Sequence, residues 1–258
     1  MQEGKVYKEI LKIAKEKGTG IFTVIDPPNQ TPKDSGIIAK AAEEAGVSGI
    51  AIGGSVGAQG ELLDKTIKEI KDNCSLPTIL FPGNIATLSK YADAIYFMYM
   101  MNSNDPYYIT GAQIASAMEI KKMGIEVIPT SYTIVEPGRA VGWIGRAKLV
   151  PRELPYLGAI SALAGQYMGS KLAILESGGG APSPAPVEMI AATKKLIDIP
   201  LIVAGGVRNE KYALECAAAG ANILHVGTAT EECDNRGKEI KEKLSRMVKA
   251  AEKGAKNH

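Results

Sequence analysis

Short apolar runs alternate with amphipathic stretches along almost the whole chain. Each run is apolar from end to end rather than at every second residue, which is typical of strands buried on both faces, as in a parallel sheet. The runs predict eight strands: Ile21–Ile25, Gly49–Ile52, Thr78–Phe81, Ala94–Met101, Glu126–Ile134, Leu172–Leu175, Leu201–Ala204 and Ile223–Val226.

The stretches between these runs place apolar residues three and four positions apart, which predicts helices. The expected helices cover Ile37–Glu44, Leu62–Ile70, Ile109–Lys122, Leu154–Tyr167, Val187–Ile197 and Lys211–Ala218. A further helix opens the chain within residues 1–18, and a last one carries an apolar stripe from Ile240 to Ala251. The third run is followed only by the short segment Ile85–Ala92, so we expect a reduced helix or an extended loop there.

Eight strand–helix alternations without a Gly/Pro-rich linker predict one α/β domain over residues 1–258, a (β/α)8 TIM barrel. This fold typically takes about 250 residues. The segment 138–152, after the fifth strand, is too long for an ordinary turn. Three interpretations of it stay open: a surface insertion, diphosphate binding through Arg139, Arg146 and Lys148, or subunit packing through Trp143.

Charge and composition restrict the partners. The net charge is +2, and Lys and Arg are dispersed beside Glu and Asp, so there is no basic stripe for a nucleic acid. No apolar run approaches the roughly 20 residues that span a bilayer, so no transmembrane segment is expected. Cys74, Cys216 and Cys233 lack metal-ligand spacing and are expected to be free thiols, as in a cytoplasmic protein.

In a TIM barrel the reactive groups lie on the loops after the carboxyl ends of the strands. The first strand is followed by Asp26 and two prolines, which would hold this carboxylate still. The second strand is followed by Gly53, Gly54 and Ser55, a tight turn that presents a hydroxyl. Asp26 is a structural carboxylate or, with Ser55 and substrate phosphate oxygens, a ligand of Mg²⁺, which needs few protein carboxylates.

The loops after the last three predicted strands are rich in glycine. They contain Glu176-Ser177-Gly178-Gly179-Gly180, Gly205-Gly206 and Gly227-Thr228. Glycine lets backbone N–H groups approach an anion closely, and the loops after strands seven and eight form the recurrent phosphate site of this fold. Three such loops on consecutive strands therefore predict a phosphate-binding site.

Other chemistry has little support. The chain has two histidines, and we expect His225 to be a core residue, so a Ser-His-Asp triad is not favoured. No GxGxxG motif follows a predicted strand, which argues against a nicotinamide cofactor. Aromatic and sulfur side chains crowd Tyr96–Met101. They pack in the core, or those near the rim, with Tyr99 and Tyr132 as candidates, line a channel for an apolar ligand.

The combination and order of these motifs resemble the geranylgeranylglyceryl phosphate synthase family, which includes bacterial heptaprenylglyceryl phosphate relatives. The resemblance covers almost the whole chain and is strongest at Thr23–Pro27, Gly53–Ser55, Leu175–Gly179, Val203–Val207 and Val226–Thr228. It implies a Mg²⁺-dependent prenyltransferase that joins sn-glycerol 1-phosphate to geranylgeranyl diphosphate through an ether bond. Pro129–Tyr132 and the insertion through Trp143 resemble the larger group of the family, which implies a homo-oligomer, a dimer or a hexamer.

The family's functional residues can be carried over position by position. The resemblance implies that Asp26 and Ser55 bind Mg²⁺. For the reaction it implies, we predict that Glu176 positions the attacking hydroxyl and accepts its proton. The residues implied to hold glycerol 1-phosphate are Ile174, Leu175, Glu176, Ser177, Gly178, Gly179, Gly180, Gly205, Gly206, Gly227 and Thr228. Ser-Gly-Gly-Gly stands where Ala-Gly-Ser-Gly is commoner, and Thr228 where many members have Asn, but backbone amides can bind phosphate in both cases.

Several alternatives stay open at this point. The same chemistry with a heptaprenyl chain, a phosphosugar isomerase or lyase barrel, and a non-catalytic phosphate sensor would all use the glycine-rich loops. The first two alternatives are enzymes. A requirement for Mg²⁺ would separate prenyl transfer from the isomerase or lyase reaction. A lipid product also implies transient contact with a membrane.

Overall fold

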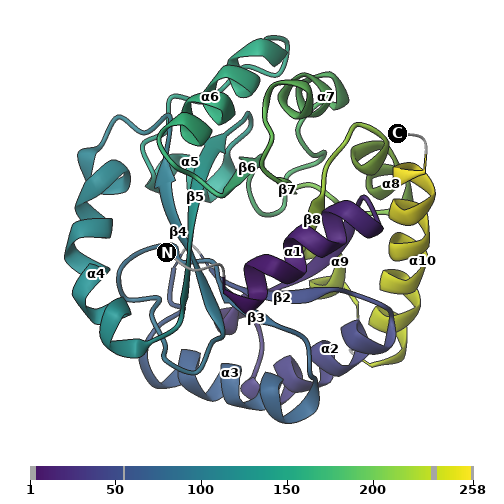
Figure 1. Cartoon of the computed structure of the whole chain (residues 1–258). Coiled ribbons are helices and arrows are strands. Elements are labelled where there is room, and N and C mark those ends of the chain that lie inside the picture. The colour runs from purple at the N-terminus through teal and green to yellow at the C-terminus, as the bar shows by residue number, and fades with distance from the viewer. Residues whose placement is uncertain (1–3, 55, 234–236, 257–258) are drawn as a thin grey trace.

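The computed structural model describes residues 4–54, 56–233 and 237–256. Its strands form one closed parallel barrel in the order of the sequence, and β1 pairs with β8 to close it (Figure 1). The strands are β1 Gly20–Ile25, β2 Gly49–Ile52, β3 Thr78–Leu80, β4 Ala94–Met100, β5 Glu126–Ile134, β6 Leu172–Glu176, β7 Leu201–Ala204 and β8 Ile223–Val226. The predicted TIM barrel is confirmed, and every predicted strand is present.

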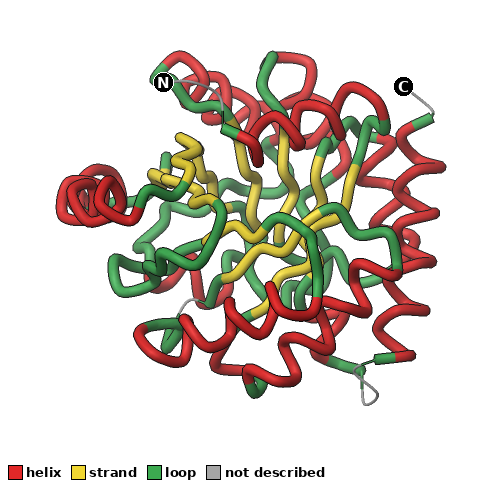
Figure 2. The backbone as a smooth tube through the Cα atoms, turned by 60° about the horizontal axis from the view of Figure 1, so that its bottom comes forward, coloured by secondary structure: helices red, strands yellow, loops and turns green. Residues whose placement is uncertain are grey.

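Helices form a ring around the strands (Figures 1 and 2). The α-helices are α1 Lys5–Glu16, α2 Pro32–Glu44, α3 Gly60–Asn73, α4 Ala112–Met123, α5 Arg139–Ile144, α6 Pro155–Tyr167, α7 Val187–Leu196, α8 Glu210–Ala218, α9 Thr228–Glu231 and α10 Lys238–Ala255. Two further short helices are η1 Pro27–Asn29, a 3₁₀-helix, and η2 Tyr107–Gly111, a π-helix. No described helix is both long enough and apolar enough to cross a membrane.

Local signals fix where these helices begin and end. Thr31 caps α2 by accepting the N–H of Asp34, and Pro32 follows at the first helical position. Asn209 caps α8 in the same way through the N–H of Tyr212. The end of α4 is set by Gly124, whose φ of 71° few other residues tolerate.

The helix α1 covers the amino-terminal end of the barrel. Val6, Ile10 and Ile13 pack into the core inside the barrel. The carboxylate of Glu126, at the start of β5, accepts the N–H groups of Val6 and Tyr7 at 2.8 and 2.9 Å. This end of the barrel is therefore filled, and the open end lies at the carboxyl ends of the strands.

The connection between β3 and β4 contains no helix, as the sequence predicts for Ile85–Ala92. The next helix, α4, follows β4 only after the π-helix η2. The outer face of β4 is therefore only partly covered, and Ile95 and Phe97 on that face line a cavity together with Leu88 and Ile120. Because no helix follows β3, the cavity at the barrel mouth extends sideways over the outer face of β4.

Candidate active site

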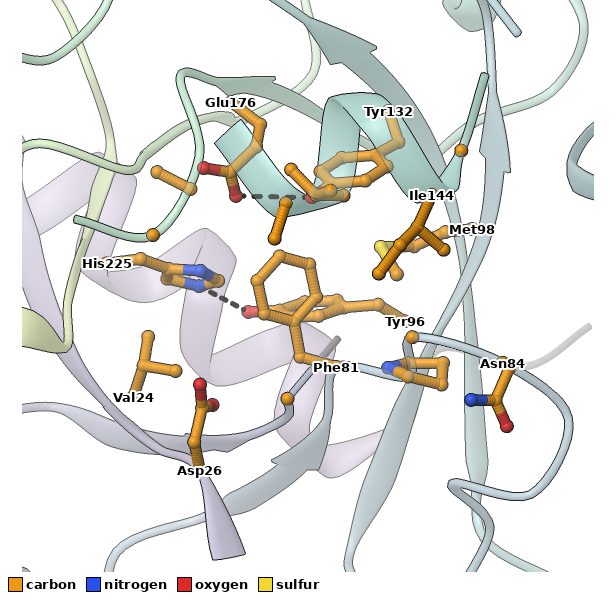
Figure 3. Close-up of a pocket in the computed structure, with 18 of the residues that line it drawn as sticks. Val24, Asp26, Phe81, Asn84, Tyr96, Met98, Tyr132, Ile144, Glu176 and His225 are labelled. Atoms are coloured by element: carbon orange, nitrogen blue, oxygen red, sulfur yellow. Dashed lines mark hydrogen bonds between the residues drawn. The ribbon is translucent and has the colours of Figure 1, made fainter. Parts of the chain in front are cut away.

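A cavity of about 550 Å³ opens at the carboxyl ends of the strands. Its polar end is lined by residues that follow β1, β6, β7 and β8. Its other part is an apolar arm that passes over β4 and under α4, between Leu88, Phe97 and Ile120. Figure 3 shows the polar end, with Asp26, Glu176 and His225 around it and Phe81 and Tyr96 beneath.

Glu176 is the last residue of β6 and is 4% exposed. Its Oε1 accepts the N–H of Gly178 at 2.6 Å, and its Oε2 accepts the hydroxyl of Tyr132 at 3.2 Å (Figure 3). Burial raises the pKa of Glu176 to about 7; the charge of Asp26 adds to the rise, and the two hydrogen bonds oppose it. The carboxyl is therefore poised to gain or lose a proton near neutral pH.

Asp26 follows β1 and precedes η1, and its carboxyl lies against the glycines that end β2. Burial, with a smaller contribution from the charge of Glu231, raises the pKa of Asp26 to about 6. No described cationic side chain forms an ion pair with Asp26. Ser55, the other predicted metal ligand, lies outside the described residues.

The loops after β6 and β7 are in such close contact that side chains are excluded at two positions. Gly205 and Gly206 have φ values of 74° and 79°. A Cβ at Gly205 would overlap the carboxylate of Glu176, and one at Gly206 would overlap the backbone of Ser183. Both positions therefore require glycine, for backbone conformation and for space.

These loops and the start of α9 present unpaired amides to the cavity. The N–H groups of Gly179, Gly206 and Thr228 have no hydrogen-bond partner within the described part of the chain. The hydroxyl of Thr228 accepts the N–H of Gly180 at 3.1 Å, which ties the loop after β6 to the one after β8. The arrangement fits an anion such as a phosphate, held by backbone amides from three loops.

Comparison with known proteins gives the family. A model described as the PcrB family matches residues 11–249. This chain belongs to the PcrB family. It is 49% identical over 230 residues to a geranylgeranylglyceryl phosphate synthase of Thermococcus kodakarensis, covering 88% of this chain and 91% of that protein.

Solved structures of PcrB-family relatives superpose closely. Wild-type GGGPS from Thermoplasma volcanium has a TM-score of 0.91 at 36% identity, over 97% of this chain and 98% of that one. The (S)-3-O-geranylgeranylglyceryl phosphate synthase of Thermoplasma acidophilum, in complex with its substrate sn-glycerol-1-phosphate, also gives 0.91, at 34% identity over 97% and 99% of the two chains.

Not every residue implied by the family resemblance reaches the cavity. Ile174 packs inside the barrel beneath the cavity, and Leu175 faces outward, against Gly158 of α6. Neither side chain lines the cavity, so any contact with a substrate at the mouth would come from their backbone. Their assignment as substrate-binding residues stays a prediction. Glu176, the next residue of the strand, points inward. Ser177 is also fully buried and does not line the cavity.

Of the two tyrosines predicted to line an apolar channel, one faces the cavity and the other faces the outside of the barrel. Tyr132 lines the cavity. Tyr99 does not: its hydroxyl donates to the backbone oxygen of Gly165 in α6 at 3.0 Å and also contacts Ser170. The prediction for Tyr99 is corrected, because successive residues of β4 face opposite sides and Met98 and Met100 take the inward positions.

The sequence reasoning missed several residues of the mouth. Glu231 in α9 lines the cavity and accepts a hydrogen bond from Asn29 at 2.6 Å. Arg208 also lines it, and its guanidinium pairs with Glu232. From segment 138–152, Ala140, Val141 and Ile144 contribute apolar surface. In the sequence, these residues could have been found only from their positions after strands five, seven and eight. No motif distinguishes them from surface residues.

The pKa of Glu176 gives a testable consequence for stability. The folded state holds its proton up to about pH 7, whereas the ordinary value is 4.5, so the folded wild type should lose stability as pH rises from 4.5 to 7. Glu176→Gln removes this loss. The variant should gain on the order of 3 kcal/mol over the wild type across that interval and keep the gain above pH 7.

Urea unfolding at a series of pH values measures this difference. Free energies of unfolding that run parallel for wild type and Glu176→Gln from pH 4.5 to pH 8 would contradict a raised pKa at this carboxyl.

Proposed function

We propose that this protein joins sn-glycerol 1-phosphate to geranylgeranyl diphosphate and so forms the ether bond of geranylgeranylglyceryl phosphate. The observation that carries the proposal is a continuous cavity with an amide-rich polar end and a long apolar arm. A small phosphorylated acceptor suits the first and a prenyl chain suits the second. The relatives named above carry this activity in their names.

Glycerol 1-phosphate occupies the polar end. Its phosphate accepts hydrogen bonds from the amides of Gly179, Gly206 and Thr228, which lack other partners within the described residues. Its hydroxyl end points down into the barrel, toward Glu176. The relative from Thermoplasma acidophilum was solved with this substrate, which supports the choice of ligand.

The prenyl chain lies in the apolar arm, against Leu88, Phe97, Met98 and Ile120. Burial of the chain there is favourable at about 25 cal/mol per Å² of apolar surface. The same walls keep water from the reacting carbon, which would otherwise capture it.

Magnesium fits the charges of this site. The charged residues that line the cavity are Asp26, Glu176, Glu231 and Arg208, and Arg208 is already paired with Glu232. Two anionic substrates would therefore meet more negative than positive charge. Asp26, half-buried and without a described cationic partner, would hold the ion together with diphosphate oxygens. No cluster of three acidic, His or Cys ligands occurs among the described residues. When bound, Mg²⁺ neutralises charge on the departing diphosphate.

The reaction then needs one bond formed and one broken. The free primary hydroxyl of glycerol 1-phosphate attacks C1 of the prenyl group, and the bond from C1 to the diphosphate oxygen breaks. Glu176, whose pKa of about 7 suits proton transfer near neutral pH, orients the hydroxyl and accepts its proton. Tyr132 donates to the same carboxylate and holds it in place.

Incubation with defined substrates tests the proposal. Protein, Mg²⁺ and sn-glycerol 1-phosphate are combined with C15, C20 or C35 prenyl diphosphate, and lipid products are identified by mass spectrometry. We expect the C20 ether as the main product and no product without glycerol 1-phosphate. A preferred C35 product would reassign the prenyl length, and no ether from any diphosphate would refute the activity.

The role of Asp26 has its own test. Asp26→Asn keeps the size of the side chain but removes the charge that would hold Mg²⁺, so turnover should fall by at least about 100-fold. Binding of glycerol 1-phosphate, measured by calorimetry without metal, should change less than about threefold, because the phosphate amides lie on other loops. An Asp26→Asn enzyme with normal Mg²⁺-dependent turnover would rule out the ligand role.

We further propose that the protein self-associates through an apolar face on α4, α5 and α6. Large apolar side chains are exposed there: Ile114, Met118, Trp143, Tyr156, Ile160, Tyr167 and Met168. Trp143 is 84% exposed and Tyr167 79%. Monomeric proteins rarely leave so many large apolar side chains in water on neighbouring helices, and aromatic anchors are typical of interfaces. The three free cysteines suit a reducing cytoplasm, with membrane contact limited to release of the lipid product.

Light scattering after size exclusion tests this interface. The wild type should elute as a dimer or larger assembly, and Trp143→Glu should shift it to smaller species at micromolar concentration. Leu62→Glu is the matched control, because Leu62 is an exposed leucine on α3, across the barrel from α6 (Figure 1). A monomeric wild type, or an assembly unchanged by Trp143→Glu, would contradict this surface as the interface.

A further inference from the structure

A pair of buried polar side chains lies beneath the polar end of the cavity. His225 of β8 and Tyr96 of β4 face each other across the barrel, and the hydroxyl of Tyr96 lies 3.2 Å from Nε2 of His225 (Figure 3). Their exposures are 3% and 0%. Phe81 packs edge-on against both rings, at 5.8 Å from Tyr96 and 5.1 Å from His225.

The other ring nitrogen of His225 makes no hydrogen bond to a described residue. Nδ1 is buried and has no hydrogen-bond partner among the described residues, although His225 lines the cavity. Buried polar atoms almost always have a partner, since leaving one unpaired costs its lost hydration. An unpaired nitrogen on the wall of a ligand cavity indicates that the ligand supplies the partner.

The hydrogen bond to Tyr96 fixes what Nδ1 offers. Burial lowers the pKa of His225 to about 3, so the ring is neutral and carries one proton. Burial also raises the pKa of Tyr96, whose hydroxyl therefore keeps its proton. A phenol donates more readily than it accepts, so Tyr96 donates to Nε2 and the imidazole proton resides on Nδ1. Nδ1 is then a donor that requires an acceptor.

His225 lies at the depth in the barrel that the hydroxyl groups of bound glycerol 1-phosphate would reach. His225 precedes Gly227 by two residues on the same inward side of β8, which puts it about 7 Å below the phosphate loop. With C–C bonds of about 1.5 Å, a glycerol backbone hung from that phosphate reaches this depth with its hydroxyls. Phe81 and Val24, which also line this floor, offer no competing acceptor.

We propose that His225, positioned by Tyr96, donates its Nδ1–H to the secondary hydroxyl of glycerol 1-phosphate and selects acceptors that carry this group. The inference rests on the proposed function, in which Glu176 takes the primary hydroxyl. His225 is then a substrate-binding residue and Tyr96 a positioning residue. A site built to bond a buried hydroxyl rejects analogues that lack it, because the donor would be left unpaired.

The test compares two acceptors in the prenyl-transfer assay: glycerol 1-phosphate and propane-1,3-diol monophosphate, which lacks only the secondary hydroxyl. The wild type should favour glycerol 1-phosphate in kcat/KM by about 3- to 10-fold, the worth of one neutral hydrogen bond. In His225→Leu this preference should vanish, through a higher KM for glycerol 1-phosphate with kcat changed by less than about threefold.

Tyr96→Phe keeps the ring and removes only the hydroxyl. It frees the imidazole to move its proton, so the preference should weaken by about twofold or more while kcat stays. Ile223→Val is the matched control: it removes one buried methylene from the same inward side of β8 and should lower thermal stability without changing the preference.

A spectroscopic readout does not depend on turnover. The chain has two histidines, so a His258→Ala protein reports only His225. Its Nδ1–H resonance should sharpen and shift when glycerol 1-phosphate is added, and not when the diol phosphate is added. A wild type without prenyl transfer would refute the proposed function. An active enzyme whose acceptor preference survives in His225→Leu, or whose Nδ1–H ignores the substrate, would refute this inference alone.

Discussion

The structure of the site depends on two carboxyl groups that line one cavity without a cationic partner among the described residues, Glu176 buried and Asp26 half-buried. Burial raises the pKa values of Asp26 and Glu176 to about 6 and 7; the charge of Glu231 adds to the rise at Asp26, and the charge of Asp26 adds to the rise at Glu176. Each pKa unit corresponds to about 1.4 kcal/mol, so a fully ionised empty site is unfavourable by several kcal/mol. Proteins retain such unfavourable charges at sites where a ligand compensates them. In the proposed function, a divalent cation would neutralise Asp26 and Glu176 would accept a proton.

The barrel creates this arrangement through strand geometry. Parallel strands end at the same edge, so Asp26 after β1 and Glu176 at the end of β6 line the same cavity although 150 residues separate them in sequence. Gly205 keeps a Cβ away from the Glu176 carboxylate, and the hydroxyl of Tyr132 satisfies its second oxygen. The glycine-rich loop after β7 therefore also makes room for the carboxylate, which explains why the two features occur together after β6 and β7.

Sequence alone predicted the parts of the molecule that depend on local pattern. Continuous apolar runs predicted all eight strands, and the shortness of Ile85–Ala92 predicted a reduced helix or an extended loop, which the structure shows as a connection without a helix. The sequence did not show which side of a strand a residue faces. Tyr99 was assigned from the aromatic run near the rim and Leu175 from the family resemblance, yet both side chains point outward against α6. A run that is apolar on both sides carries no alternation, so its register cannot be inferred from polarity.

The same limit applies to His225. A lone histidine in an apolar strand predicts a core residue, and the structure does bury it. Only the three-dimensional arrangement reveals that Tyr96 uses one nitrogen and leaves the other at a ligand cavity. The apolar arm over β4, in contrast, exists because a helix is missing. The proposed phosphate site thus follows from the general architecture of the barrel, whereas the proposed substrate selection depends on departures from that architecture: the polar pair on its floor and the uncovered face of β4.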